Sequence, residues 1–200
     1  MTYNAGQFAN LLPFIGFTPD YFILGGPADG DEAQCAVKQW KKVKVFGFEP
    51  HPRLFQWQLE NGWPTPETLY QVALDRQEGV RWFSDLDDGS DVLQASRLSS
   101  LQDRGGQQLE VSCTTLDIFY KRENIRGKAL LWLDIEGFEY QALKGANSLL
   151  ESGVVKLINV ESLERDEPMP DAVCGLLSRY GYVHVGNWGN DSVYQLEKRK

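Results

Sequence analysis

The sequence predicts an α/β fold with one mostly parallel central sheet, helices on both faces, and an antiparallel hairpin at the C-terminal end. Short apolar runs alternate with longer amphipathic runs, which is typical of strands joined by helical crossovers. Only a few turn-forming residues separate the last two runs, which favours a hairpin. A chain of 200 residues fits one domain. We expect a single domain over residues 1–200, with a helical segment at about 5–16 and a sheet core over 21–197.

The first part of the chain supplies two strands and two helices. The strands are short apolar runs that end at turn residues, Gly25-Gly26-Pro27 after the first and Glu49-Pro50 after the second. Pro52 suits the first turn of a helix because its missing N–H has no partner there. The expected strands are 21–24 and 43–48, and the expected helices are 32–40 and 52–61.

The middle of the chain contains a long polar segment between strand patterns. Residues 84–108 are polar and include an acidic stretch over 85–91, so we expect a loop there. Loops of that length inside a compact domain are usually functional. The flanking elements are expected strands at 69–74, 80–83 and 109–114 and an expected helix at 116–124.

The last part of the chain contains the clearest helix pattern. Ala142, Ala146, Leu149 and Leu150 recur at the spacing of one helix face, which predicts a helix over 138–151. Apolar runs on either side end at acidic residues. The remaining expected elements are strands at 129–133 and 154–160, a helix at 169–180, and a hairpin formed by 182–185 and 193–196.

Composition and charge exclude several classes of partner. The net charge is −8, with 28 acidic and 20 basic residues, whereas nucleic-acid binders usually carry a basic face. The same charge disfavours a membrane or polyphosphate partner. No apolar run approaches the length of a membrane-spanning helix, and the N-terminus has no signal-peptide layout. Three widely spaced cysteines are typical of a reducing compartment, so we expect a cytoplasmic protein. The negative net charge favours a small or neutral partner.

Acidic residues follow most of the expected strands. In open parallel sheets, ligands bind at the carboxyl ends of the strands, near the point where the strand order reverses. A single carboxylate at such a position can simply stabilise a turn or a helix N-terminus. Several together predict a shared site. The residues concerned are Gly25 and Gly26, Glu49, Asp75, Asp134, Glu136 and Glu161.

The first strand is followed by a glycine-rich turn that could bind a nucleotide. Gly25, Gly26 and Gly30 let a ligand approach the backbone closely. Glu49 lies 19 residues after Gly30, at the end of the next strand. A carboxylate at about that distance commonly accepts hydrogen bonds from the ribose of an adenosine cofactor. Asp75, at the end of the third strand, is either an adenine contact or a plain turn residue.

Several motifs resemble those of the FkbM-type methyltransferases. The strongest match is Leu-Asp-Ile-Glu-Gly-Phe-Glu at 133–139, which resembles that family's D-x-E-G-x-E. The segment Phe-Glu-Pro-His-Pro at 48–52 is similar to its F-E-P-x-P. Further matches, in order along the chain, are Val-Ala-Leu-Asp at 72–75, Thr-Leu-Asp at 115–117, Leu-Lys-Gly-Ala at 143–146 and Ile-Asn-Val-Glu at 158–161.

The resemblance implies a Rossmann-like, class I methyltransferase fold and transfer of a methyl group from S-adenosylmethionine (SAM) to a hydroxyl of a sugar, a glycan or a related small metabolite. The family usually has an acid where this chain has Leu24, and Asp29 or Asp134 could replace it as a partner of the SAM ammonium. The residues implied for SAM binding are Gly25, Gly26, Gly30, Glu49, Pro50, Asp75 and Asp134.

An alcohol is a poor nucleophile until a base removes its proton. By position, the candidates are Asp134, Glu136 and Glu161, with His184 as a further candidate because imidazole titrates near neutrality. Asp134 and Glu161 could instead bind a divalent cation such as Mg²⁺ or Mn²⁺. Trp188 and the acidic stretch 85–91 are the expected contacts of the acceptor.

Three alternatives remain open at the level of sequence. The glycine turn and Glu49 are compatible with an NAD-dependent oxidoreductase, although the full G-x-G-x-x-G is absent. The residue Leu24 is compatible with a non-catalytic copy of the methyltransferase fold. A chain that is fused to a glycosyltransferase, or that acts beside one, is also compatible with the resemblance. The sequence does not determine the oligomeric state.

Overall fold

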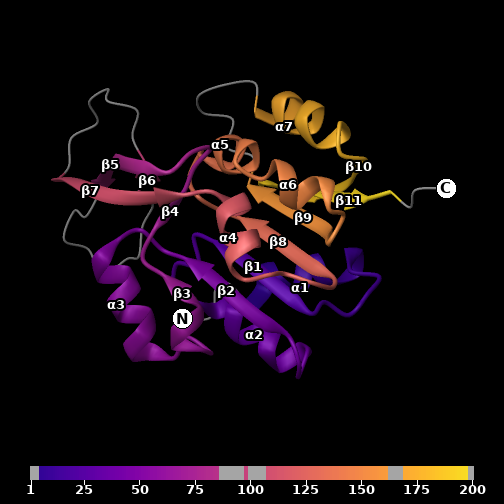
Figure 1. The fold of residues 1–200 in the computed structure, drawn as a ribbon. Coiled ribbons are helices and arrows are strands. Elements are labelled where there is room, and N and C mark those ends of the chain that lie inside the picture. The colour runs from indigo at the N-terminus through magenta and orange to yellow at the C-terminus, as the bar shows by residue number, and fades with distance from the viewer. Residues whose placement is uncertain (1–4, 86–96, 99–106, 162–168, 198–200) are drawn as a thin grey trace.

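A seven-stranded sheet forms the centre of the computed structural model, which describes residues 5–85, 97–98, 107–161 and 169–197. Five neighbouring strands are parallel, and the last two in the chain pair antiparallel at one edge (Figure 1). In spatial order they are β10 (Tyr182–Trp188), β11 (Asp191–Leu196), β9 (Val155–Glu161), β8 (Ala129–Leu133), β1 (Tyr21–Gly25), β2 (Lys44–Phe48) and β3 (Leu69–Tyr70). The predicted parallel sheet and terminal hairpin are confirmed.

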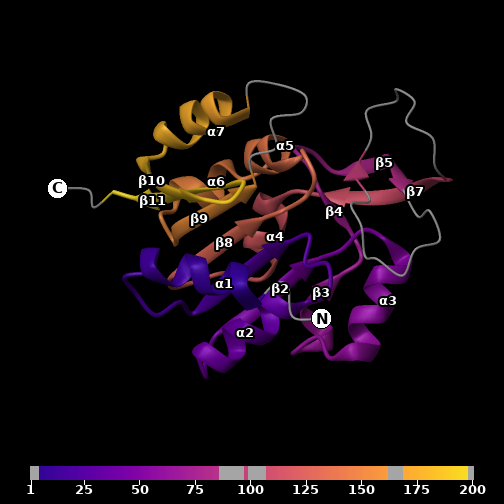
Figure 2. The same cartoon turned by 180° about the vertical axis from the view of Figure 1, so that it is seen from behind.

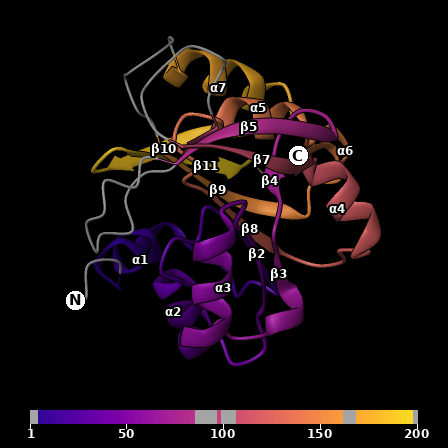
Figure 3. The same cartoon turned by 90° about the vertical axis from the view of Figure 1, so that its left-hand side faces the viewer.

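Helices cover both faces of this sheet, as parallel strands require. Figure 3 shows α1 and α2 on one side and α4 to α7 on the other, and Figure 2 shows the α1 side from behind. The first group is α1 (Ala5–Leu11), η1 (Leu12–Phe14), α2 (Asp31–Gln39), α3 (Pro52–Asn61) and η2 (Pro66–Thr68). The second group is α4 (Leu116–Arg122), α5 (Glu139–Lys144), α6 (Asn147–Glu151) and α7 (Met169–Ser178).

Each face of the sheet has its own apolar core. Alternate residues of a strand point to opposite faces, so Ile23 packs with α4 to α7 while Phe22 and Leu24 pack with α1 and α2. The strand β8 follows the same rule and is buried along its whole length. This two-sided burial explains why the central strands are continuous apolar runs in the sequence.

A second sheet is a feature that the sequence analysis did not predict. Its order is β4 (Ala73–Leu74), β7 (Gln107–Thr114), β5 (Gly79–Asp85) and β6 (Arg97–Leu98). The expected strand at 69–74 is divided, because β3 pairs with β2 whereas β4 pairs with β7. The expected loop at 84–108 is also wrong in part, since it contains β6 and the first residues of β7. Residues 86–96 and 99–106 lie outside the described part of the chain.

The expected helix at 138–151 is also divided in two, with α5 ending where Gly145 meets another part of the backbone. A Cβ on Gly145 would lie 2.3 Å from the carbonyl oxygen of Asp75, so only glycine allows this approach. The side chain of Asp117 accepts hydrogen bonds from the N–H groups of Ser148 and Leu149, at 3.0 and 2.9 Å, which stabilises the start of α6. Apolar periodicity does not report this interruption, because the buried face continues across it. Within the described residues, no helix is both long enough and apolar enough to span a bilayer.

Candidate active site

The carboxyl ends of β1, β2 and β8 meet at the point where the strand order reverses. The N–H of Gly26 donates to the carbonyl of Phe48 at 3.1 Å, and the N–H of Asp134 donates to the carbonyl of Gly25 at 3.1 Å. These hydrogen bonds hold the turns after the three strands against one another. In sheets of this type, the reversal point is the usual ligand-binding crevice. The predicted glycine turn and Asp134 therefore lie together at the point where the strand order reverses.

The glycine turn is closely packed against the end of β8. Gly26 has φ +72°, and a Cβ there would lie 1.8 Å from the carbonyl oxygen of Asp134. A Cβ on Gly25 would meet the side chains of Leu133, Leu74 and Ile135 at 3.0–3.2 Å. Gly30 has φ +76° and precedes the first residue of α2. The turn therefore needs glycine for its conformation and for the contact with the end of β8.

Replacing Gly26 with alanine is expected to weaken cofactor binding and lower the melting temperature. The left-handed conformation is unfavourable for alanine by about 1–2 kcal/mol, and the clash with backbone forces the turn to move. We expect at least about tenfold weaker binding of the demethylated SAM product, measured by calorimetry. Gly175→Ala is the control, because a Cβ there meets nothing within 4 Å. Equal binding by Gly26→Ala and the wild type would contradict this description of the turn.

Three carboxylates converge beside the turn. Asp134, Glu136 and Glu161 each place a carboxylate oxygen within 4.8 Å of those of the other two. Asp134 and Glu161 form a side-chain hydrogen bond, which two carboxyl groups can make when one is protonated. Burial and the proximity of Asp134 raise the pKa of Glu161 to about 9, and burial also raises the pKa of Asp134. Glu136 has φ +57°, a conformation that is uncommon outside glycine and is often found at functional sites. These three carboxylates are called the acidic cluster below.

Three further buried carboxyl groups near this cluster were missed by the sequence analysis. Glu139 accepts hydrogen bonds from the N–H groups of Ile135 and Gly137, at 2.8 and 3.2 Å, so it fixes the loop that carries Glu136. Asp191 accepts a hydrogen bond from Asn159 at 2.7 Å. Burial raises the pKa of Glu139 and of Asp191 to about 7. The third group, Glu32, could have been noticed because it precedes Ala33 and Ala36 on the apolar face of a helix.

Glu49 lies at the end of β2, as predicted, and is almost completely buried. Its Oε1 accepts a hydrogen bond from the N–H of His51 at 2.9 Å, across Pro50. Burial raises the pKa of its carboxyl group to about 8. His51 begins α3, where its Nδ1 accepts hydrogen bonds from the N–H groups of Arg53 and Leu54. The position of Glu49, one residue after the carbonyl that binds Gly26, agrees with the expected neighbourhood of the glycine turn.

Two predicted site residues have different surroundings from those expected. Asp75 forms an ion pair with Arg81 at 2.8 Å, so its carboxylate already has a cationic partner. His184 is exposed on the edge strand β10, opposite Tyr194, which pairs with Ile158, three residues before Glu161. Its Nε2 lies 2.7 Å from Oδ1 of Asn187. The fold does not bring His184 to the acidic cluster, because the edge strand passes the cluster at its other end, near Trp188 and Asp191.

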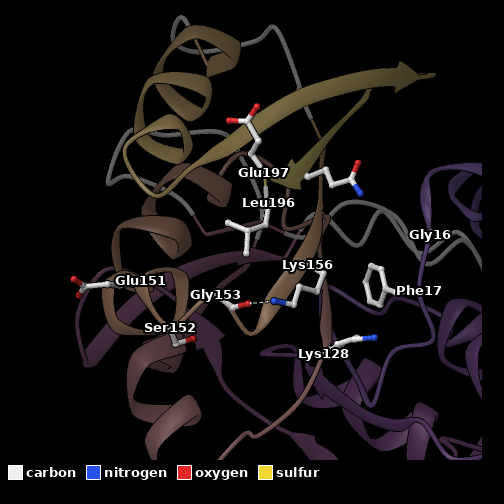
Figure 4. A pocket seen from close by; sticks show the side chains of 10 residues that line it. Gly16, Phe17, Lys128, Glu151, Ser152, Gly153, Lys156, Leu196 and Glu197 are labelled. Atoms are coloured by element: carbon white, nitrogen blue, oxygen red, sulfur yellow. Dashed lines mark hydrogen bonds between the residues drawn. The ribbon is translucent and has the colours of Figure 1, made fainter. Parts of the chain in front are cut away.

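A separate pocket of about 530 Å³ lies near the amino ends of β8 and β9 (Figure 4). Its lining includes Phe17, Lys128, Lys156 and Glu197. The ammonium of Lys156 donates to the carbonyl of Gly153 at 2.5 Å. None of the predicted site residues lines this pocket, so it has no part in the candidate active site.

Comparison with known sequences decides the family. Residues 25–183 match the sequence model of the methyltransferase FkbM domain. The chain belongs to the FkbM methyltransferase family. The match spans the glycine turn, Glu49 and the acidic cluster, and it ends at the second residue of β10. No curated protein matches the sequence.

Solved structures with low sequence identity share the fold. Magnesium protoporphyrin IX methyltransferase from Synechocystis PCC 6803, with bound SAM, superposes with a TM-score of 0.50 at 9% identity, over 95% of this chain and 75% of that chain. Precorrin-6y C5,15-methyltransferase from Geobacter metallireducens GS-15 superposes with a TM-score of 0.49 at 10% identity, over 96% of this chain and 89% of that chain. A SAM-dependent methyltransferase from Aquifex aeolicus superposes with a TM-score of 0.47 at 12% identity, over 94% of this chain and 88% of that chain. The likeness to the first of these structures shows that the FkbM chain has the class I SAM methyltransferase fold.

The residues around the point where the strand order reverses fit a cationic adenosine cofactor. Within the described part of the chain, no ion pair with Lys, Arg or His is formed by the buried carboxyl groups of Glu32 and Asp191 or by the half-buried ones of Asp134 and Glu161. Buried charges are usually paired, so a positively charged ligand would compensate them. SAM carries positive charge on its sulfonium and its ammonium. The tight glycine turn next to Glu49 suits its adenosine part.

Proposed function

We propose that this FkbM methyltransferase transfers a methyl group from SAM to a hydroxyl of a sugar, a glycan or a related small metabolite. The observation that carries the proposal is the acidic cluster, which lies beside the glycine turn at the carboxyl ends of the strands. A hydroxyl acceptor needs a base, and in this cluster burial raises the pKa of Asp134 and raises the pKa of Glu161 to about 9.

The chain's own residues have three tasks in this reaction. When bound, SAM supplies an electrophilic methyl carbon. The glycine turn and Glu49 would position the adenosine part, with Pro50 next to it. A carboxylate of the acidic cluster would accept the acceptor's hydroxyl proton while the methyl group passes from the sulfur of SAM to the acceptor oxygen, which leaves demethylated SAM as the second product. Alignment of the two reactants by the protein can contribute several kcal/mol to such a step.

Charge and aromatic side chains support a neutral acceptor. Several buried acidic groups and a net charge of −8 disfavour an anionic one. Trp188 donates a hydrogen bond from Nε1 to Asn159 at 3.1 Å, and its ring lies 5.5 Å from that of Trp132. This contact holds the half-buried indole near the start of β11, where a sugar ring could stack on it. The second predicted acceptor contact, the acidic stretch 85–91, lies almost entirely outside the described residues.

A metal-dependent version of the reaction uses the same carboxylates. Asp134, Glu136 and Glu161 offer three oxygens close enough to bind Mg²⁺ or Mn²⁺, which prefer carboxylate ligands. A cation there would lower the pKa of a bound hydroxyl, and the cluster would then orient the acceptor instead of taking its proton directly. Turnover assays with EDTA, followed by addition of Mg²⁺ or Mn²⁺, distinguish the two versions.

Calorimetry and an acceptor screen test the proposed function. The wild-type protein should bind SAM and its demethylated product, and it should not bind NAD. It should then release the demethylated product when incubated with SAM and at least one compound from a panel of sugars and glycosides. Binding of NAD alone would favour an oxidoreductase. Absence of binding to any of the three by folded protein would favour a non-catalytic copy of the fold, an alternative suggested by Leu24, which is buried in the core.

A further inference from the structure

Glu32 is a buried carboxyl group that has no role in the reaction proposed above. It lies in the first turn of α2, two residues after Gly30, and only 5% of its surface is exposed. Asp31, in the same turn, is half-buried. A buried charge without a partner is strongly unfavourable. A glutamate on the apolar face of this helix is therefore stabilised by a compensating positive charge.

Among the residues that the structure describes, the charged side chains that most influence Glu32 are acidic. Its carboxyl group is influenced by Asp29, Asp31 and Asp134, all of which disfavour its ionisation. Within the described residues it has no ion pair with a basic side chain. A hydrogen bond from its own backbone N–H favours the ionised form to a smaller extent. Burial and these neighbours raise the pKa of Glu32 to about 8, so the ligand-free protein holds this group mostly protonated at neutral pH.

Leu24 of β1 lies in the core where α2 packs against this strand. Leu24 is 1% exposed and belongs to the same apolar cluster as Ala33 and Ala36 of α2. Its side chain is therefore enclosed by the core and cannot contact a charged ligand. Figure 2 shows α2 beside the central strands on this face of the sheet. Glu32, next to Ala33, thus brings a carboxyl group from the helix to the end of the sheet where β1 ends.

We propose that Glu32 binds the α-ammonium group of SAM, and that a helix residue thereby performs the task for which Leu24 has no suitable group. This inference rests on the proposed function. An ammonium has three N–H donors, and charge-assisted hydrogen bonds to a carboxylate are among the strongest in proteins. The sulfonium is a less suitable partner, because it has no N–H and its methyl group has to face the acidic cluster. The chain therefore recognises both ends of the cofactor. Glu49 and the glycine turn bind the adenosine part, and Glu32 binds the amino-acid part.

Two ligands that differ in the amino-acid part test this assignment by calorimetry. S-adenosylhomocysteine has the ammonium, whereas 5′-methylthioadenosine lacks it. Glu32→Gln should bind S-adenosylhomocysteine at least about tenfold more weakly than the wild type, as expected for loss of a charged hydrogen bond. Its affinity for 5′-methylthioadenosine should be unchanged. Glu60→Gln is the charge-matched control, because Glu60 is exposed on α3, where its side chain accepts a hydrogen bond from Gln56.

A measurement on the wild-type protein guards against a folding defect in the variant. An analogue of S-adenosylhomocysteine in which hydrogen replaces the amino group should bind about tenfold more weakly than the parent compound. The inference is wrong if the wild type binds both equally, or if Glu32→Gln loses affinity equally for S-adenosylhomocysteine and 5′-methylthioadenosine. A wild-type protein that binds no S-adenosylhomocysteine overturns the proposed function itself. Normal binding of that compound by Glu32→Gln overturns only the role of Glu32.

Discussion

Asp134→Asn should lower the rate of methyl transfer by about 10²- to 10⁴-fold, the range usual for loss of a general base. Asp134 follows β8 directly, and its carboxyl group forms a hydrogen bond with Glu161 inside the acidic cluster. Asparagine has nearly the same shape, but it cannot accept a proton from the acceptor. Its amide also prevents Glu161 from sharing a proton at this position. The rate is measured as demethylated product formed from SAM with the best acceptor in the screen.

Binding of S-adenosylhomocysteine distinguishes this effect from damage to the cofactor site. It should change only a few-fold in Asp134→Asn, because the backbone of Asp134, not its side chain, contacts the glycine turn. Glu136→Gln should show the same pattern, since its carboxylate belongs to the same cluster. Glu60→Gln should react at the wild-type rate. Full activity in both cluster variants would show that the acidic cluster is not the reacting centre.

The free energy of unfolding of the ligand-free protein should fall as the pH rises from about 4.5 to about 8. Glu32 and Glu49 are buried carboxyl groups whose pKa values are raised from 4.5 to about 8 in the folded chain. The folded state therefore binds more protons than the unfolded state in this interval, and stability decreases with pH. Each such group contributes up to about 1.4 kcal/mol per pH unit, so the loss amounts to several kcal/mol. This trend is opposite to that of carboxylates held in salt bridges.

Thermal unfolding over this pH interval tests the prediction. Glu49→Gln keeps the shape of the side chain but does not titrate, so its melting temperature should depend less on pH than that of the wild type. Glu60→Gln, at an exposed position, should retain the wild-type profile. Saturating SAM should stabilise the protein most at the upper end of the interval, because its positive charge favours ionised Glu32. A melting temperature that rises between these pH values would contradict the assignment of buried, neutral carboxyl groups.

Much of the sheet could be predicted because its signals are local. The apolar runs of β1, β2, β8 and β9 end at Gly25, Phe48, Leu133 and Glu161, close to the expected ends. The helix α3 has the predicted bounds, since Pro52 and Gly62 mark its start and end. The segment 69–74 was misread because a strand that changes partner sheet has the same composition as one that does not. Only its contacts with β2 and β7 show the change.

The motifs of the candidate site could be predicted from the sequence, but the burial of its carboxyl groups could not. Asp134, Glu136 and Glu161 could be named because each follows a recognisable strand. Glu139 belongs to the same motif, yet its role in holding the loop is visible only in its hydrogen bonds to Ile135 and Gly137. His184 was predicted as a candidate base because of its imidazole alone. The register of the hairpin places it on β10 away from the acidic cluster, and the sequence does not show this register.

By itself the sequence determined the alternation of strands and helices, the glycine turn, and which strands end in an acid, because periodicity and turn chemistry act between residues near in the chain. Only the tertiary structure decided which acids of the chain lose contact with water. Glu32 is buried by the packing of α2 on β1, and Asp191 lies beside Glu161 because β11 pairs with β9. Burial and proximity depend on segments far apart in the sequence, and they set the charge that this site offers to a ligand.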